Sequence, residues 1–199
     1  YTARTSRSRC RKAQKSSIND CFWWKMTVLR WIWKDINLII FPNLNPDGLD
    51  HNSRNNYNNV DLNRDFIKKS QYETREFNNF LSKFDFVGGV NLHSGAIVVC
   101  HQPDSISDAV ANKDLVQKSK ELATQYCKAD PFMIENCSVS SAKNGIIGGR
   151  EWYPAYGTLD ETMMIEHGIP TICVELEESK YNMRNVDDRT SALVRFLND

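Results

Sequence analysis

The stretch Pro170-Thr171-Ile172-Cys173-Val174-Glu175-Leu176 decides the fold of this chain, because its apolar and β-branched residues predict a buried strand. Similar short apolar runs predict further strands at residues 36–41, 86–92 and 96–100. Apolar residues at helical spacing predict helices within residues 70–84, 115–126 and 192–197. Strands that alternate with helices predict an α/β domain with a mixed, mostly parallel sheet flanked by helices, and such sheets bind ligands where their strands end.

Three local patterns make more detailed predictions. The nearly continuous apolar run of residues 36–41, which Pro42 ends, predicts a strand buried on both faces. Asn45-Pro46-Asp47-Gly48 is typical of a turn. Ser70-Gln71-Tyr72-Glu73 has the spacing of a capping box, which predicts a helix that begins with Ser70 as its N-cap.

The composition excludes several classes of protein. The chain has 199 residues, of which 41% are hydrophobic and 25% are charged, with 9 Gly, 6 Pro and 6 Cys. These proportions exclude collagen, a coiled coil, extensive disorder and a disulfide-dense miniprotein. Because no run of about 18 apolar residues is present, the sequence predicts no membrane span. We also identify no secretory signal peptide in the chain.

The net charge of zero hides an uneven distribution. Residues 1–34 hold nine basic residues and one acid, a charge of +8, so residues 35–199 carry −8. We therefore expect residues 1–34 to be a basic, aromatic-rich segment distinct from a domain over residues 35–199. Composition favours a solvated tail for residues 1–17, with contact to nucleic acid or an anionic membrane as the alternative. Residues 21–34 fit either an interfacial helix or a buried helix.

Charged and polar residues at the ends of the predicted strands are candidates for function. Glu175 interrupts an apolar run, and an ionised carboxylate there has to be paired, bind a metal or act as a base. His93 directly follows another apolar run, where a histidine is either structural or a ligand. Asn63 and Arg64 place an amide beside a guanidinium in a loop, which suits forked binding of a carboxylate.

Five motifs occur in an order that resembles a known family. They are Asn45-Pro46-Asp47-Gly48, Asp61-Leu62-Asn63-Arg64, Asn91-Leu92-His93-Ser94-Gly95, Trp152-Tyr153, and Val174-Glu175-Leu176 through Lys180-Tyr181. Together they resemble the zinc metallocarboxypeptidases of the carboxypeptidase A/B superfamily, nearest to the regulatory branch that contains carboxypeptidases E, N and D. The resemblance covers residues 35–199 and implies part of a catalytic domain whose site lies at the carboxyl ends of the central strands.

The resemblance implies catalytic roles for three residues. Glu175 resembles the general base, which takes a proton from water and returns it to the leaving amine. His93 resembles the third zinc ligand of the family. Arg54, ten residues before Arg64, resembles the arginine that polarises the scissile carbonyl and stabilises the oxyanion.

The resemblance also implies how substrate is bound. Asn63 and Arg64 resemble the pair that holds the terminal carboxylate, which limits such enzymes to chain ends. Tyr153 resembles the mobile tyrosine that closes over bound substrate. Asp104, eleven residues after His93, falls where the regulatory branch places the acid of its specificity pocket, and it would favour a C-terminal Lys or Arg.

The zinc motif of the family is incomplete in this chain. The family takes two zinc ligands from a His-x-x-Glu motif that precedes the Asn-Pro-Asp-Gly segment, and this sequence contains no His-x-x-Glu. A catalytic zinc ion needs about three protein ligands. With His93 as the only identified Zn²⁺ ligand, we expect this chain to bind zinc weakly and to hydrolyse little. We interpret it as a carboxypeptidase domain truncated at its N-terminal side.

The resulting hypothesis is a zinc-dependent carboxypeptidase that removes C-terminal, basic residues from peptides or proteins. The main alternative is a catalytically inactive, carboxypeptidase-like domain that binds peptides, and a further one is an interaction protein with a basic tail. Peptide or protein C-termini are the expected partners, with no nucleic acid, and membrane contact through residues 1–34 stays open. The resemblance implies an extracellular or secretory-pathway location.

Overall fold

The computed structural model describes residues 29–33, 36–101, 113–179 and 186–197 of the chain. It divides into two compact units, one up to Asn58 and one from Asn59 onward. Within the described ranges, no helix is both long enough and apolar enough to cross a membrane.

The first unit contains a two-stranded antiparallel sheet. Strand β1 (Leu29–Trp33) pairs with strand β2 (Ile36–Ile40), with Trp31 opposite Leu38. The helix expected over residues 21–34 is therefore wrong for its described part, because residues 29–33 pair as a strand. The strand within residues 36–41 is confirmed, but its burial on both faces is not. Ile40 is 39% exposed.

A short helix, α1 (Pro46–Asp50), replaces the turn predicted at Asn45-Pro46-Asp47-Gly48. The side chain of Asn45 accepts a hydrogen bond from the N–H of Gly48 at 3.0 Å and caps the helix. Pro46 occupies the first helical position, where its missing N–H costs nothing. The same residues that suggest a turn are therefore also the residues that begin a helix well.

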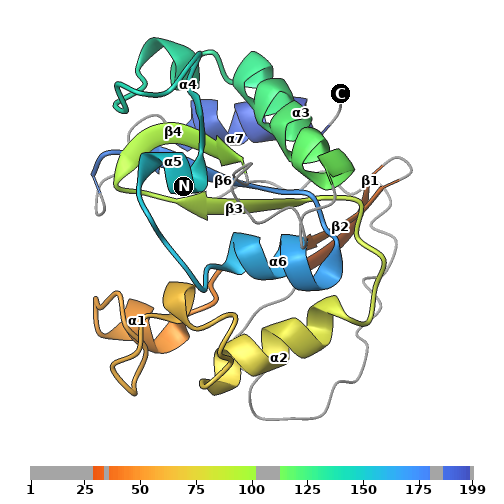
Figure 1. Ribbon diagram of the computed structural model, residues 1–199, viewed down its shortest axis with the longest axis vertical. Coiled ribbons are helices and arrows are strands. Elements are labelled where there is room, and N and C mark those ends of the chain that lie inside the picture. Colours follow the sequence, from red (N-terminus) through yellow and green to blue (C-terminus); the bar gives the residue numbers. More distant parts are fainter. Residues whose placement is uncertain (1–28, 34–35, 102–112, 180–185, 198–199) are drawn as a thin grey trace, which may run out of the picture. The chain divides into compact units, whose positions relative to one another are not determined.

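The second unit is built on a mixed four-stranded sheet in the order β3-β6-β4-β5. Strand β3 (Gly89–His93) runs parallel to β6 (Thr171–Glu177), which runs antiparallel to β4 (Ala96–His101), and β4 runs parallel to β5 (Ile146–Gly148). Figure 1 shows helices on both sides of this sheet. The predicted α/β architecture with a mixed sheet is confirmed.

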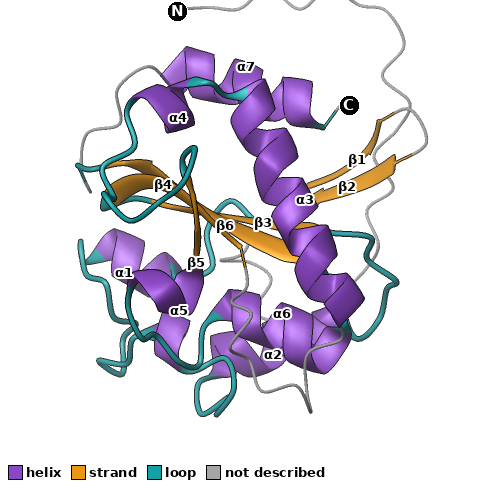
Figure 2. Ribbon diagram, turned by 45° about the horizontal axis from the view of Figure 1, so that its top comes forward, coloured by secondary structure: helices purple, strands orange, loops and turns teal. Residues whose placement is uncertain are grey.

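The two faces of the sheet have different neighbours (Figure 2). Helices α3 (Lys113–Ala129) and α7 (Val186–Phe196) cover one face, with the short α4 (Phe132–Glu135) beside them. The main core lies on this face and contains, among others, Tyr126, Met133, Ile172 and Val174. Helix α6 (Leu159–His167) packs on β6 and β3, and α2 (Tyr72–Leu81) lies on the same side of the sheet as α6. Glu175 alternates along β6 with the core residues Val174 and Leu176, so its side chain lies on the face opposite the main core.

Helix α2 is confirmed, but its predicted capping box is wrong. The N-cap is Gln71, and its side chain makes no capping hydrogen bond. The carboxylate of Asp65 caps the helix instead. It accepts hydrogen bonds from the N–H of Gln71 at 2.9 Å and from the hydroxyl of Thr74 at 2.6 Å. Ser70 also donates its hydroxyl to Asp65, at 2.5 Å. Asp65 thus satisfies the start of the helix from outside the predicted four-residue pattern.

Candidate functional site

His93 and Glu175 lie side by side at the ends of two parallel strands. The register of β3 on β6 pairs His93 with Glu175 and Asn91 with Cys173. Residues paired in this way share a face of the sheet, because side chains alternate along each strand. Glu175 is buried, with 8% of its surface exposed, and His93 is half-buried. A carboxylate and an imidazole predicted from separate motifs are thus brought together.

Asn63 reaches the same place from a loop. It lies in a short 3-10 helix, Leu62–Arg64, where its N–H donates to the side chain of Asp61 at 3.0 Å. Its Oδ1 accepts a hydrogen bond from the N–H of Leu159 at 3.0 Å, and its Nδ2 lies 3.5 Å from Nε2 of His93. Because the oxygen is held by Leu159, the amide nitrogen is the atom that faces the imidazole.

Asn91 belongs to a motif quoted above, but the sequence analysis gave it no role of its own. Its Nδ2 lies 3.1 Å from Nε2 of His93 and donates to Oδ2 of Asp160 at 3.3 Å. Two amide groups, from Asn91 and Asn63, therefore face one ring nitrogen. An amide nitrogen can only donate, so these two contacts are hydrogen bonds where Nε2 of His93 carries no proton.

Asp160 is a residue of this group that the sequence analysis did not single out. It lies in the first turn of α6, is buried, and its Oδ1 has no hydrogen-bond partner among the described residues. Burial raises the pKa of Asp160 to about 6, although the hydrogen bond from Asn91 lowers it in part. Two acids at a helix start usually indicate only favourable helix-dipole charges, so the sequence carried no sign of this burial.

Two cysteines lie close to the carboxylates of this site, and their pKa values are raised in part by them. Cys100 and Cys173 lie opposite each other on β4 and β6, and both are free thiols. Burial raises the pKa of each thiol, and the nearby carboxylates of Glu175 and Asp160 raise both further. A thiol in this environment stays protonated and is a poor metal ligand or nucleophile.

Arg64 is held close to the segment that precedes α6. Its Nη1 donates to the carbonyl oxygen of Asn63 at 2.7 Å. Gly157 has a φ of +74°, and a Cβ atom there would lie only 2.5 Å from the carbonyl oxygen of Arg64. The N–H of Phe66 donates to the carbonyl of Gly157 at 3.1 Å. Glycine is therefore needed at position 157 for conformation and for close approach to Arg64.

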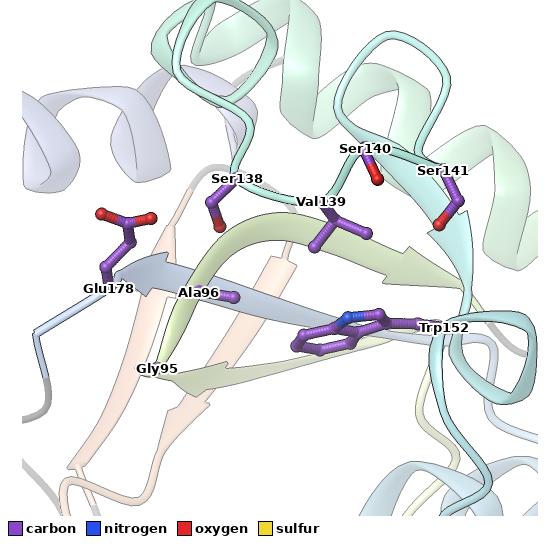
Figure 3. Close-up of a pocket in the computed structure, with 8 residues that line it drawn as sticks. All are labelled: Gly95, Ala96, Ser138, Val139, Ser140, Ser141, Trp152 and Glu178. Atoms are coloured by element: carbon purple, nitrogen blue, oxygen red, sulfur yellow. The ribbon is translucent and has the colours of Figure 1, made fainter.

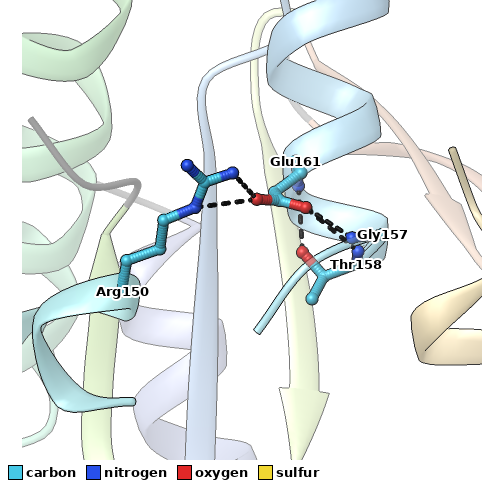
Figure 4. Close-up of polar contacts among 4 residues, drawn as sticks. All are labelled: Arg150, Gly157, Thr158 and Glu161. Atoms are coloured by element: carbon cyan, nitrogen blue, oxygen red, sulfur yellow. Dashed lines mark hydrogen bonds and ion pairs between the residues drawn. The ribbon is translucent and has the colours of Figure 1, made fainter. Parts of the chain in front are cut away.

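Tyr153 lies in a segment that an ion pair closes at its base (Figure 4). Arg150, in α5 (Gly149–Trp152), donates to Oε1 of Glu161 through Nε at 3.0 Å and also through Nη2. Oε2 of Glu161 accepts from the N–H of Gly157 at 2.7 Å. Tyr153 itself is 42% exposed and makes an edge contact with Trp152, with ring centroids 4.9 Å apart. The role predicted for Tyr153 therefore stays a prediction.

For two predicted site residues, the structure gives no position relative to this group. Arg54 lies in the first unit, where its side chain is exposed and its carbonyl oxygen accepts from Nδ2 of Asn45 at 3.0 Å. Asp104 lies outside the described residues. The roles predicted for Arg54 and Asp104 therefore stay predictions.

The described residues do not fit a zinc ion. Within ranges 29–33, 36–101, 113–179 and 186–197, no three His, Cys, Asp or Glu side chains lie together in a way that could hold a metal. Nε2 of His93 faces two amide nitrogens, and the nearby thiols are held in their protonated form. The described part of the chain therefore forms no complete metal site, and the role of His93 as a zinc ligand stays a prediction.

Comparison with known proteins gives a consistent result. Residues 23–189 match the family described as zinc carboxypeptidase. The chain is 33% identical over 165 residues to "Carboxypeptidase SOL1" of Arabidopsis thaliana, covering 75% of this chain and 33% of that protein. It is 31% identical over 187 residues to "Carboxypeptidase M" of Mus musculus, covering 80% of this chain and 40% of that protein. Carboxypeptidases D and N also match, in agreement with the predicted regulatory branch.

A solved structure resembles the fold. The product-bound structure of the ectoine utilization protein EutE (DoeB) from Ruegeria pomeroyi matches with a TM-score of 0.52 and 18% identity. The match covers 81% of this chain and 46% of that chain. At this identity the likeness concerns the fold alone. The chain thus spans less than half the length of each of these three proteins.

Proposed function

Because this chain belongs to the zinc carboxypeptidase family, as its motifs predict, we propose that it recognises peptide C-termini as part of an enzyme that hydrolyses the terminal residue. One observation carries the proposal. The amide of Asn63 lies 3.5 Å from the imidazole of His93, and His93 is in register with Glu175. An amide donor thus lies beside an imidazole that neighbours a buried carboxylate, which supports a site that binds a chain end close to a general base.

In this proposal Asn63 and Arg64 hold the terminal carboxylate of the peptide. The guanidinium supplies charge and a fork of donors, and the amide nitrogen supplies a further donor. Glu175 takes a proton from the attacking water and transfers it to the leaving amine. Tyr153 closes over the bound residue, and Arg54 stabilises the oxyanion.

The finer specificity is part of the same proposal. Asp104 would meet a basic side chain at the bottom of the pocket for the terminal residue, which favours Lys or Arg. Zn²⁺, with His93 among its ligands, belongs to the family's chemistry, and the described residues supply too few ligands for it.

A second candidate function is a non-catalytic domain that binds peptide carboxylates. It is favoured because no three side chains among the described residues lie together in a way that could hold a metal. Both functions share the Asn63 and Arg64 clamp and differ in turnover and metal content. Metal analysis of the purified protein after dialysis tests the second candidate in one direction, because stoichiometric zinc would remove it.

Titration with a short peptide that ends in arginine tests the clamp. The free acid should bind the wild-type chain at least about tenfold more tightly than the C-terminal amide, because charge-assisted hydrogen bonds to the carboxylate are lost. Arg64→Gln should abolish this difference. Lys118→Gln, an exposed charge on α3 across the sheet, is the matched control and should leave the difference intact. Equal binding of acid and amide by the wild type would refute the proposal.

A further inference from the structure

A pocket of about 410 Å³ lies at the start of β4 (Figure 3). The indole of Trp152 points into it from one end, and the carboxylate of Glu178 lies at the other end. Residues 138–141, three of which are serines, form a wall, and Gly95 and Ala96 line the pocket at the start of β4.

The chemistry of this pocket suits a cation on an aliphatic stem. Glu178 is the one charged side chain among the described residues that line it. A Lys or Arg side chain could pack its methylenes on the indole and extend its charge toward the carboxylate at the other end. The serine hydroxyls add hydrogen-bond acceptors along the wall.

The pocket adjoins three candidate site residues in the chain. Gly95 follows His93 by two residues, Glu178 follows Glu175 by three, and Trp152 directly precedes Tyr153. A peptide whose terminal carboxylate is held at Asn63 has to pass His93 and Glu175 with its upstream residues. Because Ala96 pairs with Glu177 and Val98 with Glu175, the pocket begins one strand away from Glu175, on the course that we infer for those upstream residues.

We propose that the pocket formed by Trp152, Glu178 and residues 138–141 binds a Lys or Arg side chain located upstream of the residue to be removed. This inference rests on the proposed function and adds a second basis for substrate selection. It concerns a different part of the peptide from the terminal residue that Asp104 is predicted to select.

Binding of designed pentapeptides to the full chain tests this proposal. Each peptide ends in arginine, and one Lys is moved through the three positions that precede it, with Ala elsewhere. Norleucine and acetyl-lysine replace Lys in matched peptides, and each peptide is made as acid and as amide. At one position, Lys should bind about three- to tenfold more tightly than either uncharged residue. Glu178→Gln should remove that preference, and Glu135→Gln, an exposed glutamate on α4, should retain it.

The outcomes separate the two proposals. If Lys, norleucine and acetyl-lysine bind equally at all three positions while the acid still binds better than the amide, the pocket proposal is overturned and the clamp stands. If acid and amide bind equally but the Lys preference depends on Glu178, the pocket binds basic side chains and the proposed function fails. The acetyl-lysine comparison uses the wild-type chain, so it decides the question even where a variant fails to fold. Displacement of the peptides by a neutral sugar, without any Lys preference, would assign the pocket to carbohydrate and overturn the proposal.

Discussion

The carboxylate of Glu161 is bound by the guanidinium of Arg150, eleven residues earlier in the chain. The same carboxylate accepts the N–H groups of Gly157 at 2.7 Å and Thr158 at 3.4 Å. Glu161 therefore ties both ends of the segment that carries Tyr153 and also completes the capping box of α6 with Thr158. The buried carboxylate of Glu161 thus holds together the two ends of residues 150–158, while Tyr153 in the middle of this segment is exposed.

We predict that Glu161→Gln destabilises the fold by about 2–3 kcal/mol, because a buried acceptor of several charge-assisted hydrogen bonds loses its charge. Urea unfolding followed by circular dichroism measures the change. Limited proteolysis should also cut faster within residues 150–157. The matched control is Glu166→Gln on the same helix, whose ion pair with Lys69 is partly exposed and should be worth less than about 1 kcal/mol. Equal losses in the two variants would contradict this account.

The strands and long helices could be predicted because their signals are local. The apolar run within β6 and the helical spacing in α3 depend only on neighbouring residues, and both elements form where expected. Predictions from local sequence failed where the same pattern of residues is compatible with two different secondary structures. Residues 29–33 combine aromatic and basic residues, as an interfacial helix does, yet they pair with β2 as a strand. Asn45 and Pro46 fit a turn and a helix start equally well.

The candidate site could be predicted only through its motifs. Nothing in the spacing of Asn63 and His93, thirty residues apart, indicates that their side chains meet. Asp160 was missed because its burial depends on how α6 packs on the sheet. The capping of α2 by Asp65 was missed because the carboxylate lies outside the local pattern around Ser70. A local sequence pattern does not predict contacts between residues that only tertiary packing brings together.

Gly157→Ala should lower the free energy of unfolding by more than the cost of placing alanine at a positive φ, because the added Cβ also meets a neighbouring atom. The φ of +74° costs about 1 kcal/mol for alanine, and the new Cβ would press on the carbonyl of Arg64. We expect a total of about 2–4 kcal/mol by urea unfolding, with weaker binding of C-terminal acids. Gly168→Ala is the control, because Gly168 has a φ of +65° and no atom within 4 Å of the added Cβ. If the free energy of unfolding falls equally in both variants, the contact with the carbonyl of Arg64 contributes nothing to the loss.

Asp160 should make the protein less stable as the pH rises from about 4 to 7. Its pKa is raised from 3.8 to about 6 in the folded state, so between these values the folded state binds more protons than the unfolded state. The free energy of unfolding then falls with pH, by about 3 kcal/mol in total from this group. Asp160→Asn should flatten that slope in urea unfolding at several pH values. Asp187→Asn, an exposed acid in the first turn of α7, should leave the slope unchanged.

Removal of Arg189 should be among the most damaging single changes in the second unit. Arg189 of α7 binds Oδ1 of Asp130 at 2.5 Å, both side chains are buried, and the guanidinium lies 4.0 Å from the ring centre of Phe132. Arg189→Met leaves the carboxylate of Asp130 buried without its partner, which costs about 3–5 kcal/mol. Asp130→Asn leaves a buried guanidinium in the same position. The double variant should lose clearly less than the sum of the two single losses, because no unpaired charge is left. Urea unfolding of all four proteins measures this coupling, and additive losses would show that the two groups do not depend on each other.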